Sequence, residues 1–89
     1  MDNPETRERA VTCLKENLPY SLHVRFLASF VARAYGDRAI ANRAYYLPAV
    51  AARCMLQSAG IATRAELADL AWDDVLLEAA RQITRARRN

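Results

Sequence analysis

Pro19 to Gly36, with the sequence PYSLHVRFLASFVARAYG, is the stretch that most clearly indicates the fold of this 89-residue chain. Pro19 disfavours helical geometry in the residue before it, and Ser21 is suited to cap a helix. Gly36 is suited to end that helix. Between these limits apolar side chains occupy almost every side of the helix. Polar side chains form one narrow seam: Arg25, Ser29 and Arg33. We therefore expect a helix over residues 21–35 that other helices cover on nearly all sides.

The residues before this stretch predict another helix, over residues 4–17. Asn3 can cap this helix, and Pro4 suits its first position because a proline there loses no helical hydrogen bond. Apolar residues recur at spacings of three and four, as on the buried side of a surface helix. The predicted buried stripe is Ala10, Val11, Leu14 and Leu18.

After Gly36 the pattern predicts two further helices separated by a break. Asp37 can cap a short helix over residues 38–44. Residues 45–48, with the sequence YYLP, are expected to interrupt it, because a residue that precedes proline disfavours helical geometry. A separate helix is then expected over residues 48–59, with Gly60 ending it in a Schellman motif.

The last third of the chain begins with a capping box, in which Thr63 and Glu66 have the spacing that satisfies two backbone N–H groups at a helix start. The chain is expected to kink or restart near Trp72, with Asp73 as the cap of the final helix. The inward-facing positions of these last helices are Leu67, Leu70, Leu76, Ala80 and Ile83.

Composition supports an all-α fold. Strong helix formers (Ala, Leu, Arg, Glu, Lys, Gln and Met) make up 50 of the 89 residues, whereas Val, Ile and Thr together make up 12. Residues 1–89 are therefore expected to form a single compact domain, a bundle of five to six short helices. The longest uncharged stretch, residues 54–63, is too short to span a bilayer, and the first residues do not resemble a secretory signal. We expect a cytoplasmic protein that does not bind membranes.

The net charge of +3 conceals strong zoning along the chain. Residues 21–60 carry five arginines against the single acid Asp37, whereas residues 61–78 carry five acids against Arg64. The last eleven residues contain only basic charges: Arg81, Arg85, Arg87 and Arg88. These four arginines fit two interpretations, a helix end that contacts nucleic acid, or a set of cations that complements the helix dipole and interacts with water.

Residues 54–75 locally resemble the helix–Gly–helix element of helix-hairpin-helix-like domains. The matching residues are Ala59-Gly60-Ile61-Ala62-Thr63, Glu66-Leu67, Leu70 and Asp74-Val75. In that family a glycine-bearing hairpin that contacts the DNA backbone follows, whereas residues 76–89 contain no glycine, so no binding residue is transferred. The resemblance supports DNA binding as an alternative function.

Candidate catalytic residues are few. His23 is the only histidine, and it is expected to be a partly buried, hydrogen-bonded helix residue rather than the partner of a cysteine nucleophile. Cys13 and Cys54 have no metal-binding spacing and are expected to be buried, unbridged thiols. The adjacent acids Asp73 and Asp74 fit a helix start better than acid–base catalysis. We therefore expect neither an enzyme nor a bound metal or cofactor.

Tyr45 and Tyr46 are the strongest candidates for contact with another protein. Tyrosine is enriched at protein interfaces because it combines apolar bulk with a polar tip, and a helix break would leave both rings hard to bury. With Arg38 and Arg43 they form the predicted partner-binding site of a small regulator or inhibitor that docks on a larger protein. A second candidate face is acidic, and surplus apolar surface on the helices favours a homodimer. The acidic face comprises Glu66, Asp69 and Asp73.

Overall fold

The computed structural model describes residues 4–69 and 71–88 of the chain. The elements within these residues are five helices, which confirms the all-α class and the expected helix number. The helices are α1 Pro4–Asn17, α2 Tyr20–Ala34, α3 Arg38–Ser58, α4 Arg64–Asp69 and α5 Trp72–Arg88. The predicted cap at Asn3 and the inward position of Leu70 lie outside the described residues.

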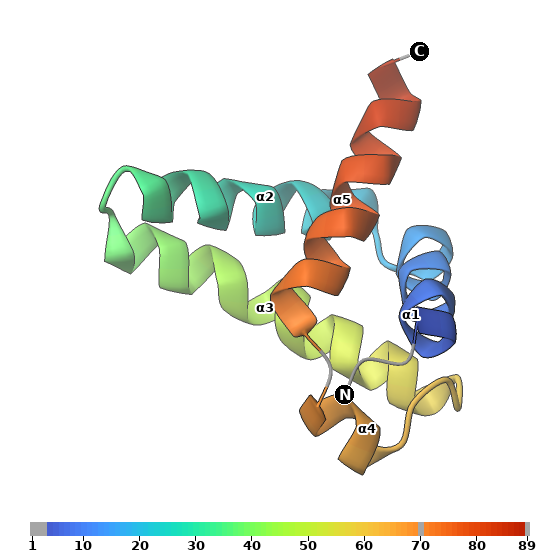
Figure 1. Ribbon diagram of the computed structural model, residues 1–89. Coiled ribbons are helices and arrows are strands. Elements are labelled where there is room, and N and C mark those ends of the chain that lie inside the picture. The colour runs from blue at the N-terminus through green and yellow to red at the C-terminus, as the bar shows by residue number, and fades with distance from the viewer. Residues whose placement is uncertain (1–3, 70, 89) are drawn as a thin grey trace.

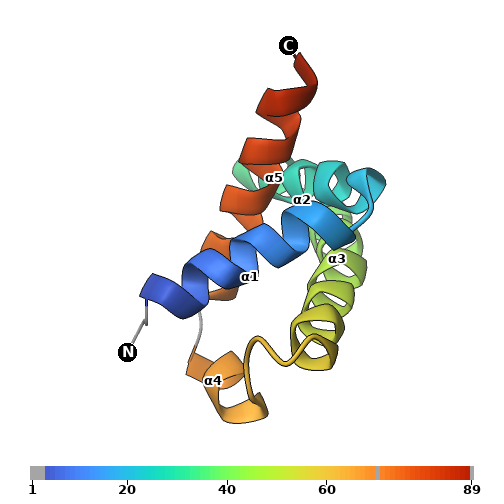
Figure 2. The ribbon, with the colours of Figure 1, turned by 90° about the vertical axis from the view of Figure 1, so that its right-hand side faces the viewer.

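Helices α2 and α3 form a long antiparallel hairpin around which the other helices are arranged (Figure 1). Helix α5 crosses one side of this hairpin, and α1 packs against α5 near the end of the hairpin opposite its loop. In the view turned by 90°, α5 lies to one side of α2 and α3, and none of the described helices lies on the other side (Figure 2). The hairpin therefore has one covered side, which holds the core, and one side that faces solvent.

The core forms where α1, α5 and the covered side of the hairpin meet. Phe26 of α2 is fully buried there, with its ring edge-on to Phe30 at 5.1 Å and tilted against Tyr45 at 5.7 Å between centroids. The predicted stripe of α1 is confirmed, since all four of its residues are buried. Leu76 and Ala80 of α5 are also fully buried, and Leu67 of α4 is nearly so. The other helices thus pack around the Phe26 ring through small and medium-sized side chains.

Most of the predicted helix ends are confirmed in atomic detail. Gly36 and Gly60 adopt φ of +80° and +69°, the left-handed region that glycine enters without steric cost. The N–H of Ile61 donates to the carbonyl of Leu56 at 3.1 Å, as a Schellman motif requires. The capping box is also present, because Thr63 and Glu66 exchange backbone-to-side-chain hydrogen bonds at 3.0 and 3.2 Å.

The predicted break at residues 45–48 is wrong, because α3 runs without interruption for 21 residues and contains Pro48 in its interior. A proline there removes one helical hydrogen bond and strains the preceding turn. The buried positions of α3 explain why the helix continues. They fall on one stripe whose register passes straight through the proline: Ala41, Pro48, Ala49, Ala52 and Leu56. Packing of this whole stripe against the core offsets the local cost.

Three expectations for α2 are also wrong. The helix begins at Tyr20 after Pro19, with no side-chain capping bond, so Ser21 is not its cap. Ser29 does not belong to an outward polar seam, because it is fully buried and its hydroxyl donates to the carbonyl of Phe26 at 2.6 Å. Nor is α2 covered on nearly all sides, since Val24 and Val31 are exposed. A hairpin whose other helices lie on one side leaves this apolar surface in solvent.

The predicted cap of the final helix is wrong by two residues. Helix α5 starts at Trp72, and the N–H of Val75 donates to the carbonyl of Ala71 at 3.0 Å. Asp73 therefore lies inside the first turn, where a carboxylate favours the helix dipole. Among the described residues, no helix is both long and apolar enough to cross a membrane.

Phe26→Ala should lower the free energy of unfolding by about 3–5 kcal/mol, because it empties the centre of the core. Val31→Ala, one to two turns further along α2 on an exposed position, should change it by less than about 0.5 kcal/mol. Urea denaturation followed by circular dichroism measures both values. Equal effects of the two substitutions would contradict the described packing.

Candidate interaction surfaces

The four residues of the predicted partner-binding site separate in the structure. Tyr45 and Tyr46 are neighbours on the continuous helix α3, so their side chains leave it about 100° apart. Tyr45 is half-buried against Phe26, whereas Tyr46 is 71% exposed. Arg38 and Arg43 are both exposed. Three of the four therefore remain accessible, and Tyr45 belongs mainly to the core.

Tyr45 links α3 to α5. Its hydroxyl donates a hydrogen bond of 2.9 Å to Oδ1 of Asp73, and the guanidinium of Arg33 lies 5.9 Å from its ring centroid. Burial and the neighbouring carboxylate of Asp73 both raise the pKa of the Tyr45 hydroxyl, which therefore stays protonated as a donor. Replacing Tyr45 would disturb this connection as well as any interface, so Tyr46 is the cleaner position at which to test binding.

The side of the hairpin that faces away from α5 carries a patch that we call the outer face. Ile40, Leu47 and Val50 of α3 are each about half exposed, and their spacing places them along the same side of the helix. Next to Ile40, between α3 and α2, is a shallow depression of about 360 Å³, which we call the outer groove. Its lining residues are Arg25 of α2 with Ile40, Arg43 and Ala44 of α3.

Two arginines are held over the outer groove by backbone carbonyls. Nη2 of Arg25 donates to the carbonyl oxygen of Arg43 at 3.2 Å, which joins α2 to α3 across the groove. Nε of Arg43 donates to the carbonyl oxygen of Ala39 at 3.4 Å. A guanidinium carries five N–H donors, so these bonds orient each group while other donors face outward. The groove thus combines apolar walls with positive charge.

The arginine-rich end of α5 projects beyond the rest of the molecule (Figure 1). Arg81, Arg85 and Arg87 are exposed, and the side chain of Arg88 lies outside the described residues. The guanidinium of Arg87 stacks on the ring of Tyr20, 3.9 Å from its centroid, so it also stabilises the contact between α5 and the start of α2. Arg81 and Arg85 share a second shallow depression with Leu27 and Thr84.

Residues of the predicted acidic face take part in local contacts. Glu66 is exposed, and its carboxylate accepts from the N–H of Thr63, which lowers the pKa of Glu66. Asp73 accepts from Tyr45 on the inner side of α3. The side chain of Asp69 lies outside the described residues. Two of these acids therefore have local structural roles, in a helix cap and in the α3–α5 contact.

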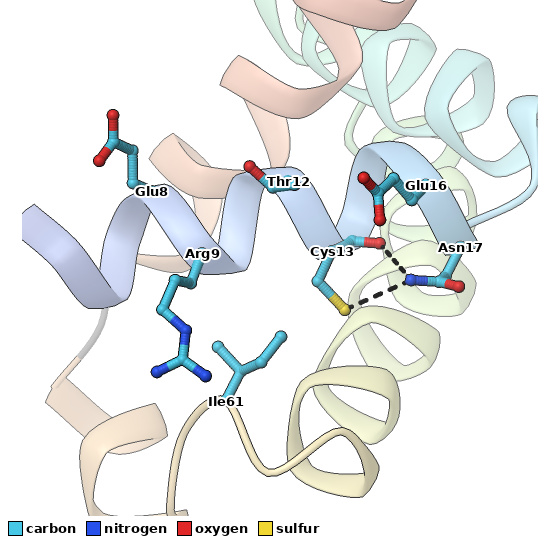
Figure 3. Close-up of a pocket in the computed structure, with 7 residues that line it drawn as sticks. All are labelled: Glu8, Arg9, Thr12, Cys13, Glu16, Asn17 and Ile61. Carbon is cyan, nitrogen blue, oxygen red and sulfur yellow. Dashed lines mark hydrogen bonds between the residues drawn. The ribbon is translucent and has the colours of Figure 1, made fainter.

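A third depression, of about 450 Å³, lies between α1 and the loop before α4 (Figure 3). Arg9 and Ile61 approach each other across it, and Cys13 lies at its inner end (Figure 3). The amide Nδ2 of Asn17 donates to the carbonyl of Cys13 at 2.9 Å and to its Sγ at 3.6 Å. The thiol of Cys13 is thus paired with an amide, which does not activate it as a nucleophile.

His23 is more deeply buried than predicted, with 1% of its surface exposed. Its Nε2 forms a hydrogen bond of 3.0 Å with the carbonyl of Leu14, which ties α2 to α1. Cys13 is buried as expected, but the prediction for Cys54 is wrong, because Cys54 is exposed on α3. Both thiols are unbridged. Among the described residues, no group of three or more His, Cys, Asp or Glu side chains could hold a metal ion.

The outer face was not identified from the sequence as a site. The residues of its groove are divided between α2 and α3, and the expected break at residues 45–48 separated Ile40 from Val50. The available signal was the unusual apolar content of both helices combined with the excess of arginine in residues 21–60. Comparison of this chain with protein-family models, with curated proteins and with solved structures found no match.

The buried His23 predicts a pH dependence of stability. Burial lowers the pKa of His23 below its ordinary value of 6.5, so the unfolded chain takes up a proton at a higher pH than the folded chain does. Stability should be fully present above pH 6.5 and should fall as the pH drops from there towards the folded-state pKa. The slope approaches about 1.4 kcal/mol per pH unit in that window. His23→Gln, which keeps a hydrogen-bond donor, is the control.

Urea denaturation at several values between pH 7.5 and pH 5 measures this dependence. The difference in stability between wild type and His23→Gln should change across the window as His23 titrates in the unfolded state. A constant difference over the whole range would show that His23 does not cause the pH dependence.

Proposed function

We propose that this protein is a small non-enzymatic regulator that acts by binding a protein partner through the outer face of the α2–α3 hairpin. The observation that carries the proposal is the row of half-exposed apolar side chains on α3, Ile40, Leu47 and Val50, on the side that no other helix covers. Apolar patches of this kind on small proteins are typical of binding sites, because leaving them in water has a free-energy cost that a partner removes.

The neighbouring residues have the character of an interface. Tyr46 precedes Val50 by one helical turn, so its exposed ring extends the outer face. Arg43 lies between Ile40 and Leu47 on the same side of α3 and supplies a side chain that is enriched among binding hot spots. The predicted partner-binding residues Tyr46 and Arg43 thus belong to the outer face, with Arg38 exposed near its start.

Photo-crosslinking in the cells from which the gene comes tests this proposal. A benzophenone amino acid at position 50 should give a discrete protein adduct, whereas the same group at exposed position 12 on α1 should not. Leu47→Asp should abolish the adduct because it introduces a charge into the apolar patch. Leu47 is half exposed, so helical content and thermal midpoint should stay unchanged. An adduct that persists in Leu47→Asp would contradict the proposal.

Nucleic-acid binding by α5 is the second candidate function. It is supported by the exposed guanidinium groups of Arg81 and Arg85 on the end of α5 that projects from the molecule. Arginines placed in this way can contact phosphates, and each contact that displaces a counterion makes the affinity depend on salt.

If this second candidate is correct, the protein should bind short duplex DNA or single strands with an affinity that falls steeply with salt. The double substitution of Arg81 and Arg85 by alanine should reduce the salt slope by about 2, and deletion of residues 84–89 should abolish binding. Substitution of Arg25 and Arg43 by alanine, on the other side of the hairpin, is the matched control. Fluorescence anisotropy measures the slopes. Absence of binding at low salt would eliminate this candidate.

A further inference from the structure

We propose that the outer groove receives an amphipathic helix of the partner whose apolar stripe is flanked by Asp or Glu. This inference rests on the proposed function and specifies the chemistry of the partner. It follows from three properties of the groove: the shape set by two antiparallel helices, the arginines held over it, and the lack of acidic side chains able to neutralise them.

The shape of the groove suits a helix. Helices α2 and α3 run side by side, and the groove contains one small side chain, Ala44 of α3. The larger side chain of Ile40 lines the groove beside Ala44, and Leu47 lies two turns further along the same side of α3; both are about half exposed. Small residues let a further helix approach closely, and its own apolar stripe would pack between the two helices as ridges pack into grooves.

The charge of the groove selects the partner. The guanidinium groups of Arg25 and Arg43 are oriented by hydrogen bonds to backbone carbonyls, not by carboxylates. The one acid in residues 21–60, Asp37, accepts from the N–H of Ile40 as a helix cap. Carboxylates on the incoming helix would supply the complementary charge and can bind a guanidinium through two parallel hydrogen bonds.

The same charges argue against a second copy of this chain as the occupant. A twofold contact would place the outer face against itself, with the arginines of one copy near those of the other. Like charges that approach each other in a contact are unfavourable, and the outer face has no acid to relieve them. The expected homodimer is therefore a weaker interpretation of this surface than binding of a different, acidic chain.

Selection from a displayed library of amphipathic helices tests the inference. Each peptide in the library spans about five helical turns and carries a fixed apolar stripe of Leu and Ile. The positions that flank this stripe vary among Glu, Lys, Gln and Ser. Wild-type protein should enrich Glu at the flanks. The double variant Arg25→Glu/Arg43→Glu should enrich Lys instead. Arg81→Glu/Arg85→Glu, a matched charge reversal on α5, should retain the wild-type preference, and Leu47→Asp should enrich nothing.

Peptides synthesised from the selected sequences provide the quantitative readout. The Glu-flanked peptide should bind wild type about tenfold or more tightly than its Lys-flanked counterpart, and this order should reverse for Arg25→Glu/Arg43→Glu. No enrichment, no charge preference, or a preference unaffected by the reversal would overturn the inference. Self-association in sedimentation experiments that Leu47→Asp weakens would overturn it in favour of a second copy.

Failure of this inference differs from failure of the proposed function. If the crosslink from position 50 depends on Leu47 but the selection shows no preference for Glu, the outer face still binds a protein, of different chemistry. If the same crosslink forms in wild type and in Leu47→Asp, the outer face is not the binding surface and both proposals fail.

Discussion

Burial of the Phe26 ring is the interaction on which the rest of the structure depends. The ring packs on Phe30 of its own helix and on Tyr45 of α3, and Tyr45 in turn donates a hydrogen bond to Asp73 of α5. The side chain of Phe26 thus holds α2 against α3 and, through Tyr45, connects this hairpin to the final helix. Since the other core side chains are mostly alanine, valine and leucine, the helices can close around this ring with little space between them.

Placing the core on one side of the hairpin has a direct consequence for function. In a chain of this length, α1, α4 and α5 are too few to cover both sides of two long helices. The uncovered side keeps Ile40, Leu47 and Val50 in solvent, together with the arginines that border them. The surface proposed to bind a partner is therefore a result of how the small core is built.

Buried and half-buried polar side chains form hydrogen bonds both between helices and within a helix. His23 bonds to the carbonyl of Leu14 in α1, Ser29 to the carbonyl of Phe26 in its own helix, and Tyr45 to Asp73 in α5. In each of these bonds a side-chain polar atom that packing removes from water has a partner. The histidine and tyrosine thus have structural roles, and the features that support a function are on the surface.

The sequence alone determined the helical class, most helix ends, the inward stripe of α1 and the buried positions Leu76 and Ala80 of α5, because caps, glycines and apolar spacing act within a few residues. It did not determine the continuity of α3, the burial of Ser29 or the separation of Tyr45 from Tyr46. These depend on which side of each helix meets another helix. The local cost of Pro48 predicted a break, but a stripe packed along the whole of α3 kept the helix intact. The outer face and its groove exist only in the tertiary structure, because they lie on the side of the hairpin that the core leaves uncovered and the groove joins residues of two helices.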